Sequence, residues 1–598
     1  MKDKEKLELT WIGKENRPRL EPRILLEDPE KSYNAPYRVT ENDIFDNRLI
    51  FGDNLLALKA LEQEFSGKIK CIYIDPPFNT QQAFEHYDDS IEHSLWLSLI
   101  RDRLVLLQEL LAVDGTLFVH IDDNELGYLV ALIDEIFGRK NRLYVITFKQ
   151  GSATGHKSIN PGCVNTTNFL LIYAKDKSHW SPNRVFTGRG RDDRYNQFIK
   201  NVEEHYSKWN ITTLAKAFSM SKGLSEKNGR VYIKKNPEEL DEFVITNAER
   251  VIRFARPSYE GVGAQTRKLI DESKSRKDTI LRLEREGYPD IYLKGGERIL
   301  FYVDKLKNID GEWLAGEPLT TLWDDVLSNN LHAEGGVDFP KGKKPEALVK
   351  RVLELTTTAG DWILDSFAGS GTTAAVAHKM RRPWITIELG EHCHTHIIPR
   401  MKKVIDGKDT SGITAAVNWK GGGGFRYFRL APSLLEKDTW GNWVISKNYN
   451  ATMLASAMAK HEGFVYNPDE TFYWKQGKST EKDYIFTTTN FITVEYLDSI
   501  HEEMQSDESL LICCKSFQEA CESRYENITV KKIPNMLLGR CEFGKEDYSL
   551  NITEMHSTAD DAFEDVLTVE TSTRKEKKKT VAKSQPGLFD DEEDNDDE

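Results

Sequence analysis

The sequence has no run of about 18 or more apolar residues, the length that a membrane-spanning helix needs. Residues 1–6 are mostly charged and carry no apolar segment of the kind that a secretory signal requires. Cysteine is scarce, with seven residues among 598, and an odd, scattered set suits free thiols rather than a disulfide framework. These absences predict a cytoplasmic protein that makes no membrane contact.

The sequence also has no excess of positive charge. It contains 81 lysines and arginines against 96 acidic residues, and its formal net charge is −15. Nucleic-acid binding depends more on how charge is distributed than on the total. Eight of the nine residues 590–598 are acidic, which is typical of a disordered tail. The stretch 183–307 instead mixes basic residues with aromatic ones, and we expect any contacts to nucleic-acid phosphates to come from Arg253, Arg256 and Lys268. The alternative is a charged helical surface with balancing acids.

Signatures of metal sites and of familiar DNA-reading motifs are missing as well. No paired cysteine and histidine ligands have zinc-finger spacing, and no clear helix-turn-helix occurs. The cysteine and histidines of residues 391–396 invite a metal interpretation, but their spacing favours a polar helix surface, and we predict no metal site. Cys513 and Cys514 are neighbours on a predicted apolar strand, so they point to opposite faces and are interpreted as packing residues.

A first functional motif follows the apolar run 71–74 and consists of Asp75, Pro76, Pro77 and Phe78. A short apolar block predicts a buried strand of a parallel sheet, and ligands bind outside the carboxyl ends of such strands. A carboxylate and a proline carbonyl can both accept hydrogen bonds from one amino group, while an aromatic ring stacks on a flat heterocycle. The motif therefore predicts a site for the amine of a nucleobase, against the alternative of a strand followed by a Pro-Pro turn.

A glycine turn between a predicted strand and a predicted helix forms the second motif. The apolar run 362–364 ends at Asp365, and Gly369 and Gly371 precede a helix-like stretch. Glycines let a ligand approach the backbone closely, and a helix amino terminus offers free N–H groups. Glu388 ends the next apolar strand, about where a ribose-binding carboxylate is expected. The pattern predicts a nucleotide-containing cofactor.

Two cofactors are compatible with the glycine turn by itself. Residues 369–374 read G-x-G-x-x-A, a pattern that also fits NAD. A hydride transferase has no use for an amine-binding Asp-Pro-Pro-aromatic site, whereas a methyltransferase that acts on a base amine needs both motifs. The combination favours S-adenosylmethionine.

Together the two motifs resemble the amino-methylating DNA methyltransferases of permuted order, in which the catalytic motif precedes the cofactor motif. The chain is similar in particular to the modification subunits of type III restriction-modification systems. Further stretches that carry the likeness, which covers most of residues 40–430, are 51–55, 115–123, 168–175, 344–346 and 422–428. The family usually has tyrosine where this chain has Phe78, a change that keeps the stacking ring, and Asp75 resembles the adenine-specific branch.

The resemblance implies an α/β fold with a doubly wound, mostly parallel Rossmann-like sheet, a large inserted target-recognition domain and a small C-terminal α/β domain. The strands that end at Asp53, Asp75 and about Asp122 are expected to form one half of the sheet, and those that end at Asp365 and Glu388 the other half. The expected divisions are an N-terminal extension (1–40), the catalytic half (41–178), the target-recognition domain (179–325), the cofactor-binding half (326–430), a C-terminal interaction domain (431–558) and a disordered charged tail (559–598). The residue pattern also predicts helices over 198–218 and 264–286 in the target-recognition domain and over 517–526 in the C-terminal domain.

The activity that the resemblance implies is site-specific transfer of a methyl group from S-adenosylmethionine to the exocyclic amine of adenine in duplex DNA. Asp75 and the carbonyl of Pro76 would hold the amine of the flipped base, and Phe78 would stack on its ring. Residues expected at the cofactor are Asp53, Asp365, Phe367, Gly369, Gly371, Thr372, Thr373 and Glu388. Alternatives are a stand-alone methyltransferase without a nuclease partner, a non-catalytic DNA-specificity subunit and a methyltransferase of RNA amines.

The partners that the resemblance implies are a second copy of the chain and a helicase-nuclease subunit, with residues 431–558 as the contact domain. In the tail, Gln585, Leu588 and Phe589 resemble the short peptide by which many bacterial proteins dock on the replication sliding clamp. A solvated tail without a partner is the alternative.

Overall fold

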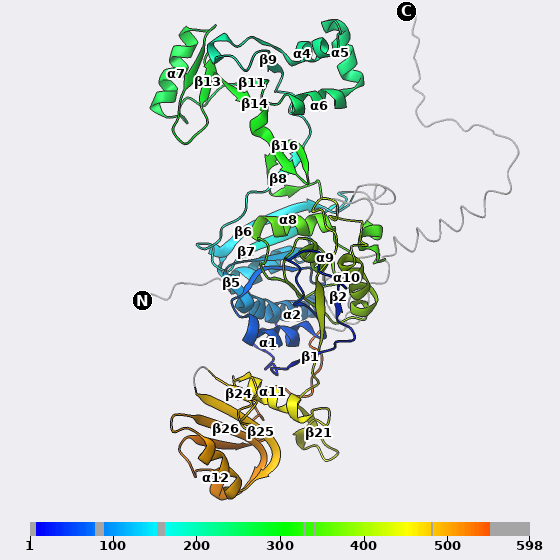
Figure 1. Cartoon of the computed structure of the whole chain (residues 1–598). Coiled ribbons are helices and arrows are strands. Elements are labelled where there is room, and N and C mark those ends of the chain that lie inside the picture. Colours follow the sequence, from blue (N-terminus) through cyan, green and yellow to red (C-terminus); the bar gives the residue numbers. More distant parts are fainter. Residues whose placement is uncertain are drawn as a thin grey trace, which may run out of the picture.

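The computed structural model describes residues 8–77, 89–151, 162–326, 331–339, 343–479 and 482–549. A central domain built on one large sheet lies between two smaller units, as Figure 1 shows. One is an arm formed by residues 186–318, and the other is a C-terminal unit formed by residues 435–532. The arrangement places the arm and the C-terminal unit at opposite ends of the central domain.

The central sheet has eleven strands in the order β1-β20-β3-β19-β18-β4-β5-β7-β6-β17, with β2 paired to β20. The six strands from β20 to β5 are parallel, whereas β7 runs antiparallel between β5 and β6. The prediction of a mostly parallel α/β sheet is therefore confirmed. The strand bounds are β1 Leu25–Glu27, β2 Tyr33–Asn34, β3 Asn47–Phe51, β4 Ile69–Ile74, β5 Leu111–Ile121, β6 Arg142–Lys149, β7 Thr167–Ala174, β17 Leu322–Trp323, β18 Ile363–Asp365, β19 Trp384–Glu388 and β20 Gly424–Leu430.

Helices cover both faces of this sheet. One face carries α1 (Asn54–Phe65), α2 (Asp89–Leu110) and α3 (Leu126–Ile133), and the other carries α8 (Glu346–Thr356), α9 (Thr372–Lys379) and α10 (Ile398–Ile405). Side chains alternate along β4, so that Ile72 and Ile74 enter the first core while Cys71 and Tyr73 enter the second. Burial on both faces explains why the strand reads as one continuous apolar run.

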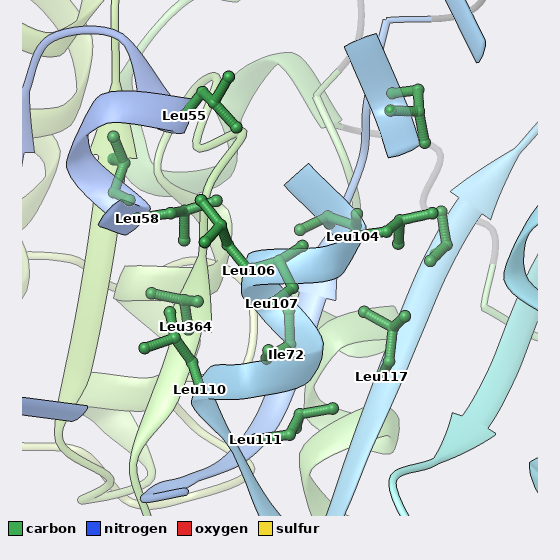
Figure 2. Packing of buried hydrophobic residues seen from close by; sticks show 14 of the residues in the cluster. Leu55, Leu58, Ile72, Leu104, Leu106, Leu107, Leu110, Leu111, Leu117 and Leu364 are labelled. Carbon is green, nitrogen blue, oxygen red and sulfur yellow. The ribbon is translucent and has the colours of Figure 1, made fainter. Parts of the chain in front are cut away.

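Figure 2 shows the first of these cores at close range. Leucines of α1 and α2 meet the branched side chains of three parallel strands; they are Leu55, Leu58, Leu104, Leu107, Leu110, Ile72, Leu117 and Leu364. Each fully buried aliphatic side chain of this size contributes about 1.5–3 kcal/mol. The core therefore fixes the strand ends, and with them the residues that follow the strands.

The order of the strands corrects one prediction. The strands that end at Asp53, Asp75 and about Asp122 were expected to form one half of the sheet, but β18 and β19 lie between β3 and β4. The chain passes from β3 through α1 across both strands to reach β4, so the two sequence halves interleave in space. Crossovers of this kind are governed by helix packing on the sheet, which the strand motifs alone do not encode.

The interleaving creates a topological switch point between β18 and β4. These strands are parallel neighbours, with Leu364 opposite Ile72. From β18 the chain leaves through α9 to β19 on one side, whereas from β4 it leaves through α2 to β5 on the other. Open α/β sheets bind their ligands in the crevice outside the carboxyl ends of the strands at such a point.

The arm has two sheets of its own, in the orders β10-β9-β11-β14-β13-β12 and β15-β16-β8. Its strands are β8 Phe186–Arg189, β9 Gln197–Ile199, β10 Ile211–Thr213, β11 Val251–Ala255, β12 Ile280–Leu283, β13 Ile291–Lys294, β14 Glu297–Phe301, β15 Leu306–Ile309 and β16 Glu312–Pro318. Its helices are α4 Leu214–Ser221, α5 Glu226–Lys235, α6 Pro237–Thr246 and α7 Ala264–Ser275. Separate apolar clusters stabilise the arm, which accounts for its extension away from the central domain (Figure 1).

Two helices expected within the arm are partly strands. The aromatic stretch 198–218 begins with strands β9 and β10 and becomes helical only at Leu214. The charged run 264–286 is helical as far as Ser275 and then forms β12, which pairs with β13. In both places pairing with a neighbouring strand overrides a local preference for helix.

The C-terminal unit contains a five-stranded sheet in the order β23-β24-β25-β26-β27. Its elements are β21 Leu435–Lys437, β22 Trp443–Ile445, α11 Ala451–His461, β23 Val465–Tyr466, β24 Gly477–Lys478, β25 Asp483–Ile492, α12 Val494–Glu503, β26 Ser509–Phe517 and β27 Ile528–Lys532. Cys513 and Cys514 enter different cores on opposite faces of β26, as predicted. The helix expected over 517–526 is wrong, because β26 extends to Phe517 and leaves room for a single 3-10 turn.

The chain then returns from the C-terminal unit to the central domain. Residues 542–549 lie against the N-terminal extension, where Arg23 pairs with Glu546. The backbone N–H of Tyr548 donates to Asp53 at 3.1 Å, directly after β3. The expected boundary between central domain and C-terminal unit is therefore crossed twice by the chain.

Candidate active site

Asp75 stands at the carboxyl end of β4, on one side of the switch point. Its Oδ2 atom lies 3.0 Å from the ammonium nitrogen of Lys344, and its Oδ1 atom lies 3.6 Å from Nδ1 of His120. Oδ1 is buried and has no hydrogen-bond partner among the described residues. The following Pro-Pro turn is fixed because the Trp96 indole donates to the carbonyl of Pro77 at 2.9 Å. One carboxylate oxygen is thus held by a cation, and the other remains available as an acceptor.

Two opposing effects act on the pKa of this carboxylate. Burial raises the pKa of Asp75, and the Lys344 ammonium counteracts that rise. Burial also lowers the pKa of His120 well below its usual value, with Lys344 adding to the effect, so the ring is neutral. Asn168 lies 3.0 Å from Nε2 of His120 and fixes the ring beneath Asp75.

The glycine turn after β18 forms the other side of the switch point. The Phe367 N–H donates to Oδ1 of Asp365 at 2.9 Å, which tightens the turn directly after the strand. Gly369 and Gly371 have φ values of 52° and 76°, in the left-handed region that favours glycine. A Cβ atom at Gly371 would lie 3.1 Å from Cγ2 of Ile397, so a larger residue would crowd the turn as well as strain it.

Glu388, at the end of β19, joins the two strand ends of this side. Its carboxylate accepts the Gly369 N–H at 2.8 Å and the Gly390 N–H at 2.9 Å, and His392 lies 2.9 Å from the same group. A carboxylate offers about four lone-pair sites, so it can hold the turn and still accept ligand hydroxyls. The geometry is compatible with the ribose role predicted for Glu388.

Asp365 has a strongly raised pKa. Burial raises its pKa to about 7, against the lowering effect of hydrogen bonds from Thr373 and the Phe367 N–H, and the charges of Asp75 and Glu388 add to the rise. Asp365 is almost fully buried. Its charge state therefore changes near neutral pH.

Three predicted cofactor residues make structural contacts here. Asp53 caps α1 by accepting the Leu56 N–H at 3.0 Å, lies 3.4 Å from Arg103 and accepts from Tyr548. Thr372 and Thr373 are buried in the first turn of α9. The cofactor roles of these three residues stay predictions.

A buried ionic network that the sequence did not reveal supports the glycine turn from behind. Arg400 donates to Oγ1 of Thr372 at 2.9 Å and to the carbonyl of Ser370 at 3.3 Å. It also pairs with Glu346 at 2.8 Å, and Glu346 pairs with Lys379 at 2.7 Å. These three charged side chains are fully buried. The network ties the starts of α8 and α9 together.

The predicted DNA-contacting residues lie in the arm, away from the switch point. Arg253, on β11, is half-buried with its guanidinium 5.1 Å from the centre of the Tyr195 ring. Arg256 is exposed and lies 3.2 Å from Glu297, and Lys268 is exposed on α7. Arg298 shares the sheet face of Arg253, because its strand partner is Ala255. The Nε atoms of Arg253 and Arg298 are buried without a hydrogen-bond partner among the described residues.

Some predictions fall outside the described residues: Phe78 and the tail residues Gln585, Leu588 and Phe589. Residues 393–397 form a short π-helix, and His394 contacts Glu391 and Tyr427. In the described parts of the chain, no group of three or more potential metal ligands occurs. None of the helices there combines the length and apolar character needed to cross a membrane.

Lys344 and His120 were missed as site residues by the sequence interpretation. Lys344 belongs to a stretch that carried the resemblance, but nothing in a Lys-Pro-Glu sequence points to an aspartate far upstream. His120 lies in an apolar strand and looks like an ordinary core histidine. The available signal was that His120 stands near the end of a strand predicted in the same half of the sheet as the strand that ends at Asp75.

The model of the N6/N4 DNA methylase family matches residues 69–399. A protein of Haemophilus influenzae named probable type III restriction-modification enzyme HindVI Mod subunit is 36% identical over 410 residues, which cover 65% of this chain and 54% of that protein. The type III restriction-modification enzyme EcoP15I Mod subunit of Escherichia coli is 28% identical over 452 residues, which cover 65% of each chain. This chain thus spans between about half and two thirds of these relatives.

Among solved structures, a DNA modification methylase from Thermus thermophilus matches with 13% identity and a TM-score of 0.30. The match covers 64% of this chain and 99% of that one. A TM-score this low supports no conclusion about this chain.

Proposed function

Because the chain belongs to the DNA methylase family, whose model matches more than half of its length, we propose that it methylates the exocyclic amine of adenine in duplex DNA. S-adenosylmethionine is the proposed methyl donor. The observation that carries the proposal is the position of Asp75, whose Oδ1 atom is buried and unpartnered among the described residues, across the switch point from the glycine turn. An amine acceptor and a nucleotide cradle then meet in one crevice.

The residues around the glycine turn fit S-adenosylmethionine. Asp365 and Glu388 place two carboxylates at neighbouring strand ends, suited to a cationic and hydroxyl-bearing ligand. The Oγ atom of Ser366 is buried and has no partner in the described part of the chain, which leaves a polar group for a ligand to satisfy. When bound, S-adenosylmethionine supplies an electrophilic methyl group on a sulfonium.

The chain's own residues would prepare the amine. An adenine amine is a weak nucleophile because its lone pair is delocalised into the ring. Hydrogen bonds from the amine to Asp75 Oδ1 and to the Pro76 carbonyl would favour a pyramidal nitrogen whose lone pair points at the methyl group. The carboxylate would also stabilise the positive charge that develops on the nitrogen. The amine held in this way would accept the methyl group that bound S-adenosylmethionine supplies, and it would then release one proton to water.

The likeness to type III Mod subunits supports a restriction-modification role, with a helicase-nuclease subunit and a second copy of the chain as partners. The arm would read the target sequence, and the sliding clamp remains a candidate partner of the tail. A stand-alone methyltransferase, a non-catalytic specificity subunit and an RNA methyltransferase are the competing functions.

One assay separates methylation of duplex DNA from the RNA methyltransferase and from the non-catalytic specificity subunit. The protein is incubated with labelled S-adenosylmethionine and with duplex DNA, single-stranded DNA or RNA, and any modified base is mapped by digestion and mass spectrometry. N6-methyladenine in duplex DNA alone is the expected result. Label in RNA would favour the RNA enzyme, and absence of label from all three would favour a specificity subunit.

A first prediction follows from the charge state of Asp365. Burial raises the pKa of Asp365 to about 7, so it is mostly neutral at pH 5.5 and mostly ionised at pH 7.5. If the ionised form attracts the cationic cofactor, affinity falls by about tenfold or more as the pH decreases across this range. Calorimetric titration at both pH values measures the change. Asp365→Asn should bind weakly at both, and an equally strong pH dependence in that variant would contradict the assignment.

A second prediction concerns the arm. Replacing Arg253, Arg256 and Lys268 together with alanine should weaken duplex binding and make the slope of log affinity against log salt shallower by about 2–3, because each phosphate contact releases counterions. Fluorescence anisotropy over a salt series measures the slope. The matched control replaces Arg230, Lys234 and Lys235, three exposed cations of α5 in the same arm. An equal effect of both triple variants would move the DNA surface elsewhere.

A further inference from the structure

Lys344 links the two sides of the switch point. Its backbone carbonyl accepts a hydrogen bond from Oγ1 of Thr372 at 3.3 Å, at the first residue of α9 after the glycine turn. Its ammonium lies 3.0 Å from Oδ2 of Asp75, at the end of β4. The Lys344 side chain is only 9% exposed, so water screens this ion pair weakly. One residue is therefore bonded to the cofactor turn through its backbone and to the amine site through its side chain.

The groups that face Asp75 differ in charge. From β5 comes the neutral His120 ring, from β4 the Tyr73 phenol, and from β18 the acidic Asp365. Tyr73 and His120 are themselves in contact at 3.4 Å. Lys344 is the cation that acts on the carboxylate. It offsets the effect of burial, which favours a protonated Asp75.

We infer that Lys344 is a positioning residue for methyl transfer, one that keeps Asp75 ionised and anchors Oδ2 so that Oδ1 is directed at the target amine. The inference rests on the proposed function. A protonated Asp75 would present an O–H donor to the amine in place of an acceptor, and an unanchored carboxylate could rotate away from it. The shared hydrogen bond to Thr372 also means that a shift of the cofactor turn moves the ammonium, which couples the two sides of the crevice.

The test compares Lys344→Met, which removes the charge and keeps the length, with Lys344→Arg, which keeps the charge. The matched control is Lys343→Met, because Lys343 is a neighbouring buried lysine whose ammonium bonds the Val337 carbonyl and not Asp75. Methyl transfer to duplex DNA is measured from pH 5 to pH 9 at saturating S-adenosylmethionine. Cofactor affinity is measured by calorimetry, and melting curves establish that each variant is folded.

We expect the acidic limb of the pH profile to move upward by about 1–3 pH units in Lys344→Met, because an opposite charge at this distance shifts a carboxyl by about that amount. Activity should recover at high pH, and both Lys344→Arg and Lys343→Met should keep the wild-type limb. An acidic limb that stays at its wild-type position in Lys344→Met, whatever the maximal rate, would overturn the inference.

A second readout does not depend on turnover. The infrared difference spectrum between each protein and its Asp75→Asn derivative isolates the Asp75 carboxyl, whose protonated band should persist to higher pH in Lys344→Met than in wild type. Equal titration in the two would overturn the inference whether or not the protein methylates DNA. If Lys344→Met does not fold, Lys344→Gln takes its place with the same expected shift. Failure of the wild type to methylate any substrate would instead refute the proposed function.

Discussion

Asp75→Ala is expected to abolish methyl transfer while S-adenosylmethionine still binds. The carboxylate acts on the target amine, and it lies across the switch point from the glycine turn. Loss of a single preorganised charge at a reacting centre typically costs about 10²–10³-fold in rate. Single-turnover transfer of labelled methyl groups measures the rate, and calorimetry measures cofactor affinity.

The matched control is Asp114→Ala, which removes a carboxylate near the amino end of β5, at the opposite edge of the same sheet, where Asp114 pairs with Lys70. This control should keep both rate and affinity. Near-normal turnover in Asp75→Ala would remove Asp75 from the mechanism. Loss of cofactor binding in the same variant would place Asp75 in the cofactor site instead.

Gly371→Val is expected to weaken S-adenosylmethionine binding by at least about tenfold. Position 371 has a φ of 76°, where a non-glycine residue costs about 1–2 kcal/mol and a β-branched one more. Its new side chain would also meet Ile397, whose Cγ2 is 3.1 Å from the place that a Cβ atom would take. The turn must then shift away from Glu388 and Asp365. Calorimetric titration with the cofactor provides the measurement.

Gly360→Val separates backbone strain from crowding. Gly360 has a φ of 90°, but a Cβ atom there has nothing within 4 Å, and the residue precedes β18 at the far edge of the sheet. The control should therefore lose some stability in thermal unfolding and keep its cofactor affinity. Equal cofactor affinities in Gly371→Val and wild type would mean that the cofactor pocket lies elsewhere.

The strand ends were the part of the site that the sequence could reveal. Asp75, Asp365 and Glu388 each follow a short apolar run, and burial of both sheet faces makes such runs easy to recognise. Gly369 and Gly371 marked the turn because both adopt the left-handed backbone conformation, which favours glycine.

The remainder depends on contacts between distant parts of the chain. The pairing of Lys344 with Asp75, and the insertion of β18 and β19 between β3 and β4, arise only when helices pack on the sheet. Local propensity likewise misjudged residues 198–218, where pairing of β9 with β11 decides the outcome. Long-range pairing and long-range ion pairs leave no trace in a short window of sequence.

The base of the arm has an evolutionary consequence. β8 and β16 pair antiparallel, with Gly188 opposite Gly316, so the chain enters and leaves the arm at adjacent points. An inserted domain whose two ends lie together can be replaced as one unit, because the rest of the chain has to join it at only one place. Recombination that replaces residues 186–318 would leave the strands of the crevice and their buried cores untouched. Gene exchange of this kind would supply a new arm and leave the central domain unchanged.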